Sequence, residues 1–349
     1  MKKRTVILLL AMGLFISLGV LFYVKIGWVT WGREDLDGKR MGYSFDVATD
    51  TTANRLFVAA GNRGLHILKL DQGILTYITT YYDGGYYRNL KVRRDRAFIA
   101  DGQRGLVVLD ISADIPITTW IQSDSKAYGI HIEGDNAFVA AVTQGLEIFD
   151  ISNPDSPILL SMVKTSGEAW DVWLHNDIAY VADVDKGITV IDVSSPIEPH
   201  QVSFVTWAES NPSAEIVRGD GDVICVAAGN NGLILIDVSN PIQPTISSQY
   251  HPVRIGWAEG LAIRDGLVYL SFGSDFAHVS TIENGLHILD MTNPYTPMLL
   301  SKVNFLDWVE GVHVDGDYAY VANTYAGVRS IDIQNPTRPY WVGTFNIFP

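Results

Sequence analysis

The chain has 349 residues, of which 47 % are hydrophobic and 11 % aromatic, so it can bury a large core and is not of a disordered composition. Its formal net charge is −14, with 39 acidic against 25 basic residues, which argues against a nucleic-acid ligand because a phosphate backbone requires clustered Lys and Arg. The only cysteine, Cys225, excludes a disulfide or a thiolate metal site within one chain.

The first 25 residues predict a membrane anchor. Lys2, Lys3 and Arg4 precede residues 5–24, twenty residues without a charge, which is about the length that spans a bilayer. A cleaved signal peptide usually has a shorter apolar core followed by a small-residue cleavage site, and none follows here. We therefore expect residues 1–25 to form an uncleaved, single-pass signal anchor in the cell membrane and residues 26–41 a tether. The positive-inside bias then places the rest of the chain on the extracytoplasmic side, periplasmic or extracellular. A cleaved export signal is the alternative.

Residues 42–349 repeat one pattern seven times. Each copy has a run such as "GLEIFDISNP", and these runs begin at Gly64, Gly105, Gly145, Gly187, Gly232, Gly285 and Gly327. A second recurring run, such as "NAFVAAV", precedes each of them. One period offers four short β-rich runs separated by Gly, Pro, Asn and Asp, and its length of about 40 to 45 residues is typical of a propeller blade. The sequence therefore predicts an all-β, seven-bladed β-propeller with four-stranded blades.

The recurring run resembles the repeat of the LVIVD-repeat family, which consists of exported bacterial and archaeal propellers. Glycine, alternating aliphatic residues, Asp and a Ser-Asn-Pro turn recur in register, as in "GLILIDVSNP" from Gly232. The first copy departs from the pattern, since Lys69 replaces the Asp, and the second copy lacks Asn-Pro. The resemblance implies an exported propeller and no particular reaction.

The Asp of the repeat invites interpretation as a metal ligand, but its spacing favours a structural role. It occurs in six copies, as Asp110, Asp150, Asp192, Asp237, Asp290 and Asp332. One Asp per blade at the same place on the third strand cannot converge on one ion. We predict instead that each carboxylate accepts backbone N–H groups of the turn that follows it.

The residues that enter the first strand of each repeat are rich in Trp and acidic side chains. In a propeller this strand is the innermost, so these residues surround the central channel on one face. We predict a ligand-binding rim made of Asp46, Arg88, Tyr128, Trp170, Asp171, Trp207, Glu209, Glu215, Trp257, Glu259, Trp308 and Glu310. Aromatic faces suit sugar rings or basic side chains, and convergent carboxylates suit cationic groups or Ca²⁺. The alternative is that the Trp residues pack between blades while the acids are solvated.

These features favour a non-catalytic platform that binds a protein or a glycan at the cell surface. The sequence has no phosphate-binding loop, metalloprotease motif, zinc-ligand spacing or nucleophile elbow, so we expect no cofactor and no metal site, with Ca²⁺ at the rim as the alternative. One alternative is a carbohydrate-active hydrolase or lyase that uses Glu259, Glu310 or Asp171. Another is a structural scaffold of an envelope complex. An extension in the sixth repeat, with Asp275, His278 and Glu283, is a further candidate for partner contact.

Overall fold

The computed structural model describes residues 43–122, 125–207, 212–252, 256–273, 284–305, 308–324 and 326–346. The chain divides into two units, Met1–Met41 and Gly42–Pro349, and all described residues belong to the second. The expected anchor and tether, Glu209, and the extension of the sixth repeat therefore lie outside the described residues. Over the described ranges, no helix has the length and apolar character needed to cross a membrane.

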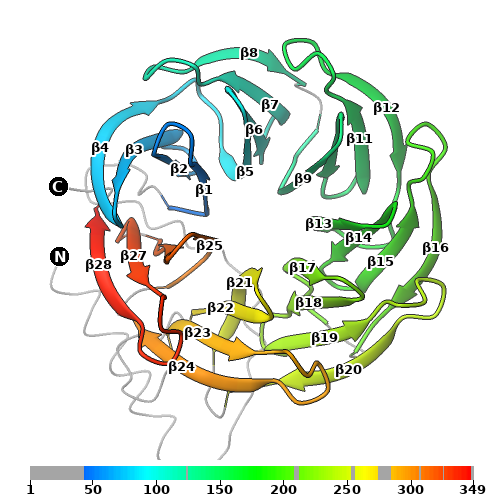
Figure 1. The fold of residues 1–349 in the computed structure, drawn as a ribbon. Coiled ribbons are helices and arrows are strands. Elements are labelled where there is room, and N and C mark those ends of the chain that lie inside the picture. The colour runs from blue at the N-terminus through cyan, green and yellow to red at the C-terminus, as the bar shows by residue number, and fades with distance from the viewer. Residues whose placement is uncertain are drawn as a thin grey trace, which may run out of the picture. The chain divides into compact units, whose positions relative to one another are not determined.

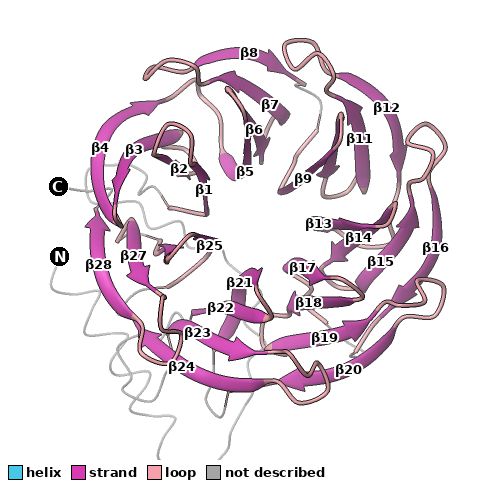
Figure 2. Cartoon of the chain, viewed as in Figure 1, coloured by secondary structure: helices cyan, strands magenta, loops and turns pink. Residues whose placement is uncertain are grey.

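The second unit is a ring of seven four-stranded antiparallel sheets, each made of four consecutive strands (Figure 1). All of the regular elements in its described residues are strands, and the first strand of each sheet lies nearest the axis (Figure 2). The prediction of an all-β propeller with seven four-stranded blades is confirmed. Blades one to four comprise β1 (Asp46–Asp50), β2 (Arg55–Ala59), β3 (Leu65–Asp71) and β4 (Ile74–Tyr81); β5 (Tyr87–Arg93), β6 (Arg96–Asp101), β7 (Gly105–Asp110) and β8 (Ile117–Ile121); β9 (Gly129–Glu133), β10 (Asn136–Ala140), β11 (Leu146–Asp150) and β12 (Ile158–Val163); β13 (Ala169–His175), β14 (Ile178–Asp183), β15 (Gly187–Asp192) and β16 (His200–Val205). Blades five to seven comprise β17 (Ile216–Asp220), β18 (Val223–Ala227), β19 (Leu233–Asp237) and β20 (Thr245–Tyr250); β21 (Trp257–Arg264), β22 (Leu267–Gly273), β23 (Gly285–Asp290) and β24 (Met298–Asn304); β25 (Val312–Asp315), β26 (Tyr318–Ala322), β27 (Val328–Asp332) and β28 (Tyr340–Phe345).

The middle strands are apolar on both faces because every blade is covered by a neighbour on each side. In β18, Ile224 packs into a cluster shared with blade four, whereas the next residue, Cys225, packs into a cluster shared with blade six. This follows from the alternation of side chains along a strand. Both residues are fully buried. The core is thus a series of layers between blades, and each middle strand contributes to two of them.

The Asp of the repeat lies at the end of the third strand and shapes the turn after it. In each of the six copies its Oδ1 accepts the backbone N–H of the residue two positions later, which is Ser112, Ser152, Ser194, Ser239, Thr292 or Gln334. The hydroxyls of Ser194, Ser239 and Thr292 also donate to the carboxylate of their turn. The six carboxylates are therefore held by the backbone of their own turns, spread around the outer part of the ring.

The proline of the same turn takes part in a contact between blades. In four places a serine of an outermost strand donates its hydroxyl to a proline carbonyl in the turn of the next blade, at 2.5 to 2.6 Å. The pairs are Ser161 with Pro196, Ser203 with Pro241, Ser248 with Pro294, and Ser301 with Pro336. These bonds link blades three to seven around the circumference.

The ring closes between blades seven and one without exchange of a strand. The hydroxyl of Ser44 donates to the carbonyl of Gly327 at 3.0 Å, and the hydroxyl of Ser330 donates to the carbonyl of Gly73. Gly343 occupies the position in β28 that a serine occupies in blades three to six. A Cβ at Gly343 would lie 2.7 Å from the Gly73 oxygen, so closure requires glycine there.

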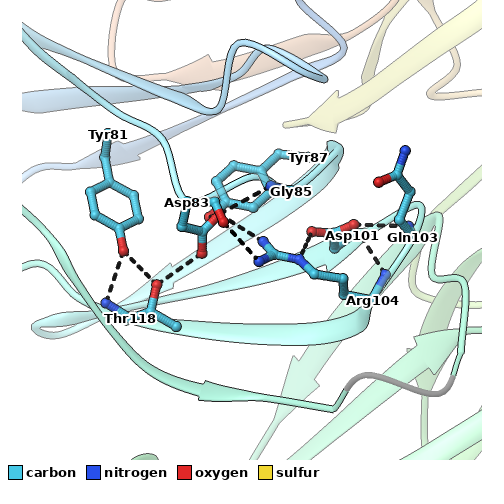
Figure 3. A network of polar contacts seen from close by, with 8 residues as sticks. All are labelled: Tyr81, Asp83, Gly85, Tyr87, Asp101, Gln103, Arg104 and Thr118. Carbon is cyan, nitrogen blue, oxygen red and sulfur yellow. Dashed lines mark hydrogen bonds and ion pairs between the residues drawn. The ribbon is translucent and has the colours of Figure 1, made fainter.

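Blades one and two are joined by a partly buried network of charged and hydroxyl groups (Figure 3). Arg104 forms ion pairs with Asp83 at 2.7 Å and Asp101 at 2.8 Å. Asp83, which follows β4, also accepts hydrogen bonds from the hydroxyls of Tyr87 and Thr118. These bonds and Arg104 lower the pKa of Asp83 against the opposing effect of burial. The network fixes the connection between the two blades that diverge most from the repeat.

Candidate functional site

Each blade has one structurally equivalent residue at or beside the start of its innermost strand. These seven residues lie at the end of the channel where the innermost strands begin. In four blades the backbone N–H of this residue donates to the carbonyl of an alanine in the second strand at 2.9 Å. In the other three, β5, β13 and β21, it lies at a break in register, and such bulges redirect a side chain. We call these seven residues the mouth ring: Phe45, Arg88, Tyr128, Trp170, Glu215, Glu259 and Glu310.

The mouth ring surrounds one cavity of about 60 Å³ on the axis of the propeller. All seven of its side chains belong to the cavity wall, together with backbone and side chains of the next positions, such as Asp46 and Asn89. The repeat therefore brings seven segments, up to 265 residues apart in sequence between Phe45 and Glu310, to one small space. Six of the seven ring residues belong to the predicted rim; Phe45 is the addition.

Blades one to four supply an aromatic half that encloses an arginine. The guanidinium carbon of Arg88 lies 4.0 Å from the ring centre of Tyr128, 4.7 Å from that of Phe45 and 5.8 Å from that of Trp170. Tyr128 and Trp170 meet edge to face at 5.4 Å. The positive charge of Arg88 is thus held by the electron-rich faces of three rings from three other blades.

Blades five to seven supply a carboxylate half, made of Glu215, Glu259 and Glu310. Glu215 is only 4 % exposed, and its Oε1 accepts a hydrogen bond from the Trp257 indole at 3.3 Å. Its Oε2 is buried and has no hydrogen-bond partner. Burial raises the pKa of Glu215 to about 8, the charge of Glu310 adds to the increase, and Arg88 opposes it. Near neutral pH, Glu215 therefore retains its proton.

Two other predicted rim residues, Asp46 and Asp171, are one position further into the channel and connect neighbouring blades. Oδ2 of Asp46 accepts the backbone N–H of Leu90 in blade two at 3.2 Å, and Oδ2 of Asp171 accepts that of Val217 in blade five at 3.0 Å. Asp171 is fully buried and forms an ion pair with Arg218. Its carboxylate is thus occupied in holding two blades together.

Below the mouth ring the channel widens into a second cavity of about 280 Å³. Its wall includes Lys91, Arg218 and His313, three residues that the rim prediction missed. Burial and the nearby charge of Lys91 lower the pKa of His313 to about 4, so its imidazole is neutral at physiological pH. His313 shares a hydrogen bond with Thr49 at 3.0 Å, which adds a contact across the closing seam.

The remaining predicted tryptophans pack between blades and do not line the cavity. A Cβ at Gly229 would lie 2.7 Å from the Trp257 ring, and one at Gly273 would lie 2.8 Å from the Trp308 ring. Each indole therefore lies against a glycine of the preceding blade. Trp207 donates its indole N–H to the carbonyl of Pro212 at 2.8 Å. Their placement agrees with the packing alternative for the Trp residues.

A regular spacing in the sequence marks the mouth ring. In six blades the ring residue precedes by twelve positions a small residue of the second strand, which is Ala100, Ala140, Ala182, Ala227, Ser271 or Ala322. The missed channel residues Lys91, Arg218 and His313 each lie three positions after a ring residue. Aligning these six repeats on that small residue would have identified six ring residues and the three channel residues; in the first blade Phe45 precedes Ala59 by fourteen positions and departs from the spacing.

The described residues contain no group of three or more His, Cys, Asp or Glu side chains arranged to hold a metal ion. The three glutamates of the carboxylate half thus share a cavity wall without forming a preorganised metal cage. What the site offers is a charge-polarised mouth: a fixed cation among aromatic rings on one side and acceptors on the other.

The fold and this site define a seven-bladed β-propeller with a polarised channel mouth. The LVIVD repeat model matches residues 84–114, 124–165, 166–206, 213–251, 270–305 and 309–347. These matches cover more than half of the chain, and the chain belongs to the LVIVD-repeat family. The resemblance stated from the sequence is confirmed, and the first blade, where the repeat departs from the pattern, is not matched.

Solved structures share the fold at low sequence identity. Sqt1 from Saccharomyces cerevisiae has a TM-score of 0.65 at 12 % identity, covering 88 % of this chain and 87 % of its own. A functionally unknown protein from Desulfotomaculum acetoxidans has a TM-score of 0.65 at 11 % identity, covering 85 % and 94 %. The computationally designed Ika8 protein has a TM-score of 0.61 at 9 % identity, covering 86 % of both chains. No curated protein matches the sequence.

Proposed function

We propose that this protein is a non-catalytic binding platform that takes a protein or glycan ligand at its mouth ring. The observation that carries the proposal is the divergence of the ring within a regular repeat. The backbone position is the same in all seven blades, yet its side chains divide into an aromatic and cationic half and a carboxylate half. Side chains that served only to pack identical blades would be expected to repeat as the core positions do.

The carboxyl groups of the site suit binding better than catalysis. Asp171 is fully buried and its Oδ2 is paired with Arg218 and bonded to the backbone of Val217, which makes it a poor candidate for a base or nucleophile. Glycoside hydrolysis needs two carboxyl groups on opposite sides of the scissile bond, with room for a sugar between them. The mouth cavity of about 60 Å³ gives little support for that reaction. The carbohydrate-active alternative therefore ranks second.

The proposal places the platform on the extracytoplasmic side of the cell membrane, held by residues 1–25. Support comes from the sequence, where three basic residues precede twenty uncharged ones. The predicted tether, residues 26–41, would then separate the propeller from the membrane. Alkaline carbonate extraction of membranes, with protease treatment of intact cells, tests both the anchoring and the orientation.

Cross-linking capture from native envelopes tests the platform itself. The full-length protein is compared with a Glu259→Gln, Glu310→Gln double variant and with a control that loses the same two charges at exposed sites, Glu133→Gln with Glu198→Gln. We expect the ring variant to lose a captured protein or glycan that the control retains. Identical capture by all three would refute a role for the mouth ring. Turnover of a polysaccharide that stops in the ring variant would favour the enzyme instead.

A further inference from the structure

We infer that the carboxylate half of the mouth ring binds one basic side chain, a lysine ammonium or an arginine guanidinium, presented by a protein partner. This inference rests on the proposed function and specifies the chemistry of its ligand. Three features of the mouth carry it: a buried carboxyl oxygen without a hydrogen-bond partner, a cavity of restricted size, and a cation that already occupies the opposite half.

The first feature is the unpaired oxygen of Glu215. This side chain belongs to the cavity wall and is 4 % exposed, and its Oε2 has no hydrogen-bond partner. The other oxygen is held by the Trp257 indole, and Trp257 itself packs against Gly229, so the carboxyl group is fixed in place. A buried carboxyl oxygen without a hydrogen-bond partner is costly and uncommon in folded proteins. Near neutral pH this carboxyl group holds a proton; a basic ligand would displace that proton to solvent, and the ionised Oε2 would then accept the ligand's N–H.

The second feature is the size of the cavity. At about 60 Å³ it has room for a few non-hydrogen atoms, such as the end of a lysine or arginine side chain. Sites that enclose a drug-sized ligand or a sugar are several-fold larger, roughly 300 Å³ or more. The ligand should therefore enter with one thin extension and keep the rest of its surface on the propeller face.

The third feature is the division of charge around the ring. Arg88 already lies within 4.0 to 5.8 Å of three aromatic ring centres, so the aromatic half has its cation. The cavity wall also holds Asp46, which accepts the backbone N–H of Leu90, and Arg218, which is paired with Asp171. The negative charge of the mouth ring itself lies on Glu259 and Glu310, and Glu215 can ionise when a further cation approaches. A charge-assisted hydrogen bond to these carboxylates is stronger than a neutral one, which favours a basic group over a sugar hydroxyl.

The test uses the full-length protein in mild detergent and four capped peptides of the form acetyl-Gly-Ser-X-Ser-Gly-amide, where X is Lys, Arg, norleucine or Glu. Binding is followed by the NMR resonance of the Trp257 indole N–H, which contacts Glu215. We expect saturable shifts with the Lys and Arg peptides and none with norleucine or Glu. The Glu259→Gln, Glu310→Gln variant should weaken Lys-peptide binding by about ten- to a hundredfold. The Glu133→Gln, Glu198→Gln control should not.

Each other outcome overturns the inference in a distinguishable way. Equal binding of the norleucine peptide, or Lys-peptide binding that persists in the ring variant, shows that the carboxylates do not select a cation. Saturation by cello- or chito-oligosaccharides without any response to Lys or Arg peptides overturns the inference but keeps the proposed function. Saturation by CaCl2 alone reassigns the site to a metal. If none of these probes shifts a ring resonance, the inference fails, and the capture experiment then decides separately on the proposed function.

Discussion

Replacement of Glu215 by Gln should remove a pH dependence from the stability of the propeller. Glu215 is 4 % exposed, and burial raises its pKa from the usual 4.5 to about 8. Between these two values the folded state binds a proton that the unfolded state has released. Stability therefore falls as the pH rises through that window and levels off above about 8. Glutamine keeps an acceptor for Trp257 and carries no charge, so the variant should lack this fall.

The size of the effect follows from the width of the window. One pKa unit corresponds to about 1.36 kcal/mol, so a shift from 4.5 to about 8 has an upper limit of roughly 5 kcal/mol. Between pH 5 and pH 9 the free energy of unfolding of Glu215→Gln, relative to the wild type, should therefore rise by up to about 4 kcal/mol. The variant should be close to the wild type at pH 5 and clearly more stable at pH 9.

Urea unfolding followed by tryptophan fluorescence at pH 5, 6, 7, 8 and 9 measures this difference. The control is Glu133→Gln, which removes a carboxylate from an exposed position at the end of β9. A difference between Glu215→Gln and the wild type that stays constant across the five pH values would refute the reasoning, because it would mean that burial does not hold the proton on Glu215.

Three further predictions concern the contacts between blades, and urea unfolding at pH 7 measures each of them. Arg104→Met should lower the free energy of unfolding by about 3–5 kcal/mol, because it leaves the buried carboxylate of Asp101 and the partly buried carboxylate of Asp83 without their cation; a loss below 1 kcal/mol would contradict this. Ser203→Ala removes one hydrogen bond to Pro241 and should cost about 1 kcal/mol, whereas Ser247→Ala, which gives up no such bond, should cost less. Gly343→Ala should cost about 1–3 kcal/mol through the contact with the Gly73 carbonyl, and an unchanged midpoint would show that the closing seam can relax.

The sequence alone determined the repeat and therefore the architecture. The recurrence of "GLEIFDISNP" and its relatives defines seven periods, and each period offers four strands. One blade cannot cover both of its own apolar faces, so the seven blades must pack against one another. The local role of Asp150 can also be predicted from the sequence. Its carboxylate lies two residues before a backbone N–H of the turn and accepts a hydrogen bond from that group. These features depend on contacts within one repeat or between identical neighbours.

The composition of the mouth depended on the tertiary structure. Trp257 and Glu259 are two residues apart in one rim segment, yet Trp257 packs against Gly229 whereas Glu259 lines the cavity. Asp171 follows the ring residue Trp170 directly, yet it is buried against Arg218 of the next blade. Side-chain direction at a bulge, and the partner that a neighbouring blade supplies, are set by contacts between segments far apart in the chain. The residue types were visible in the sequence, but which of them share one cavity is decided only when seven blades close into a ring.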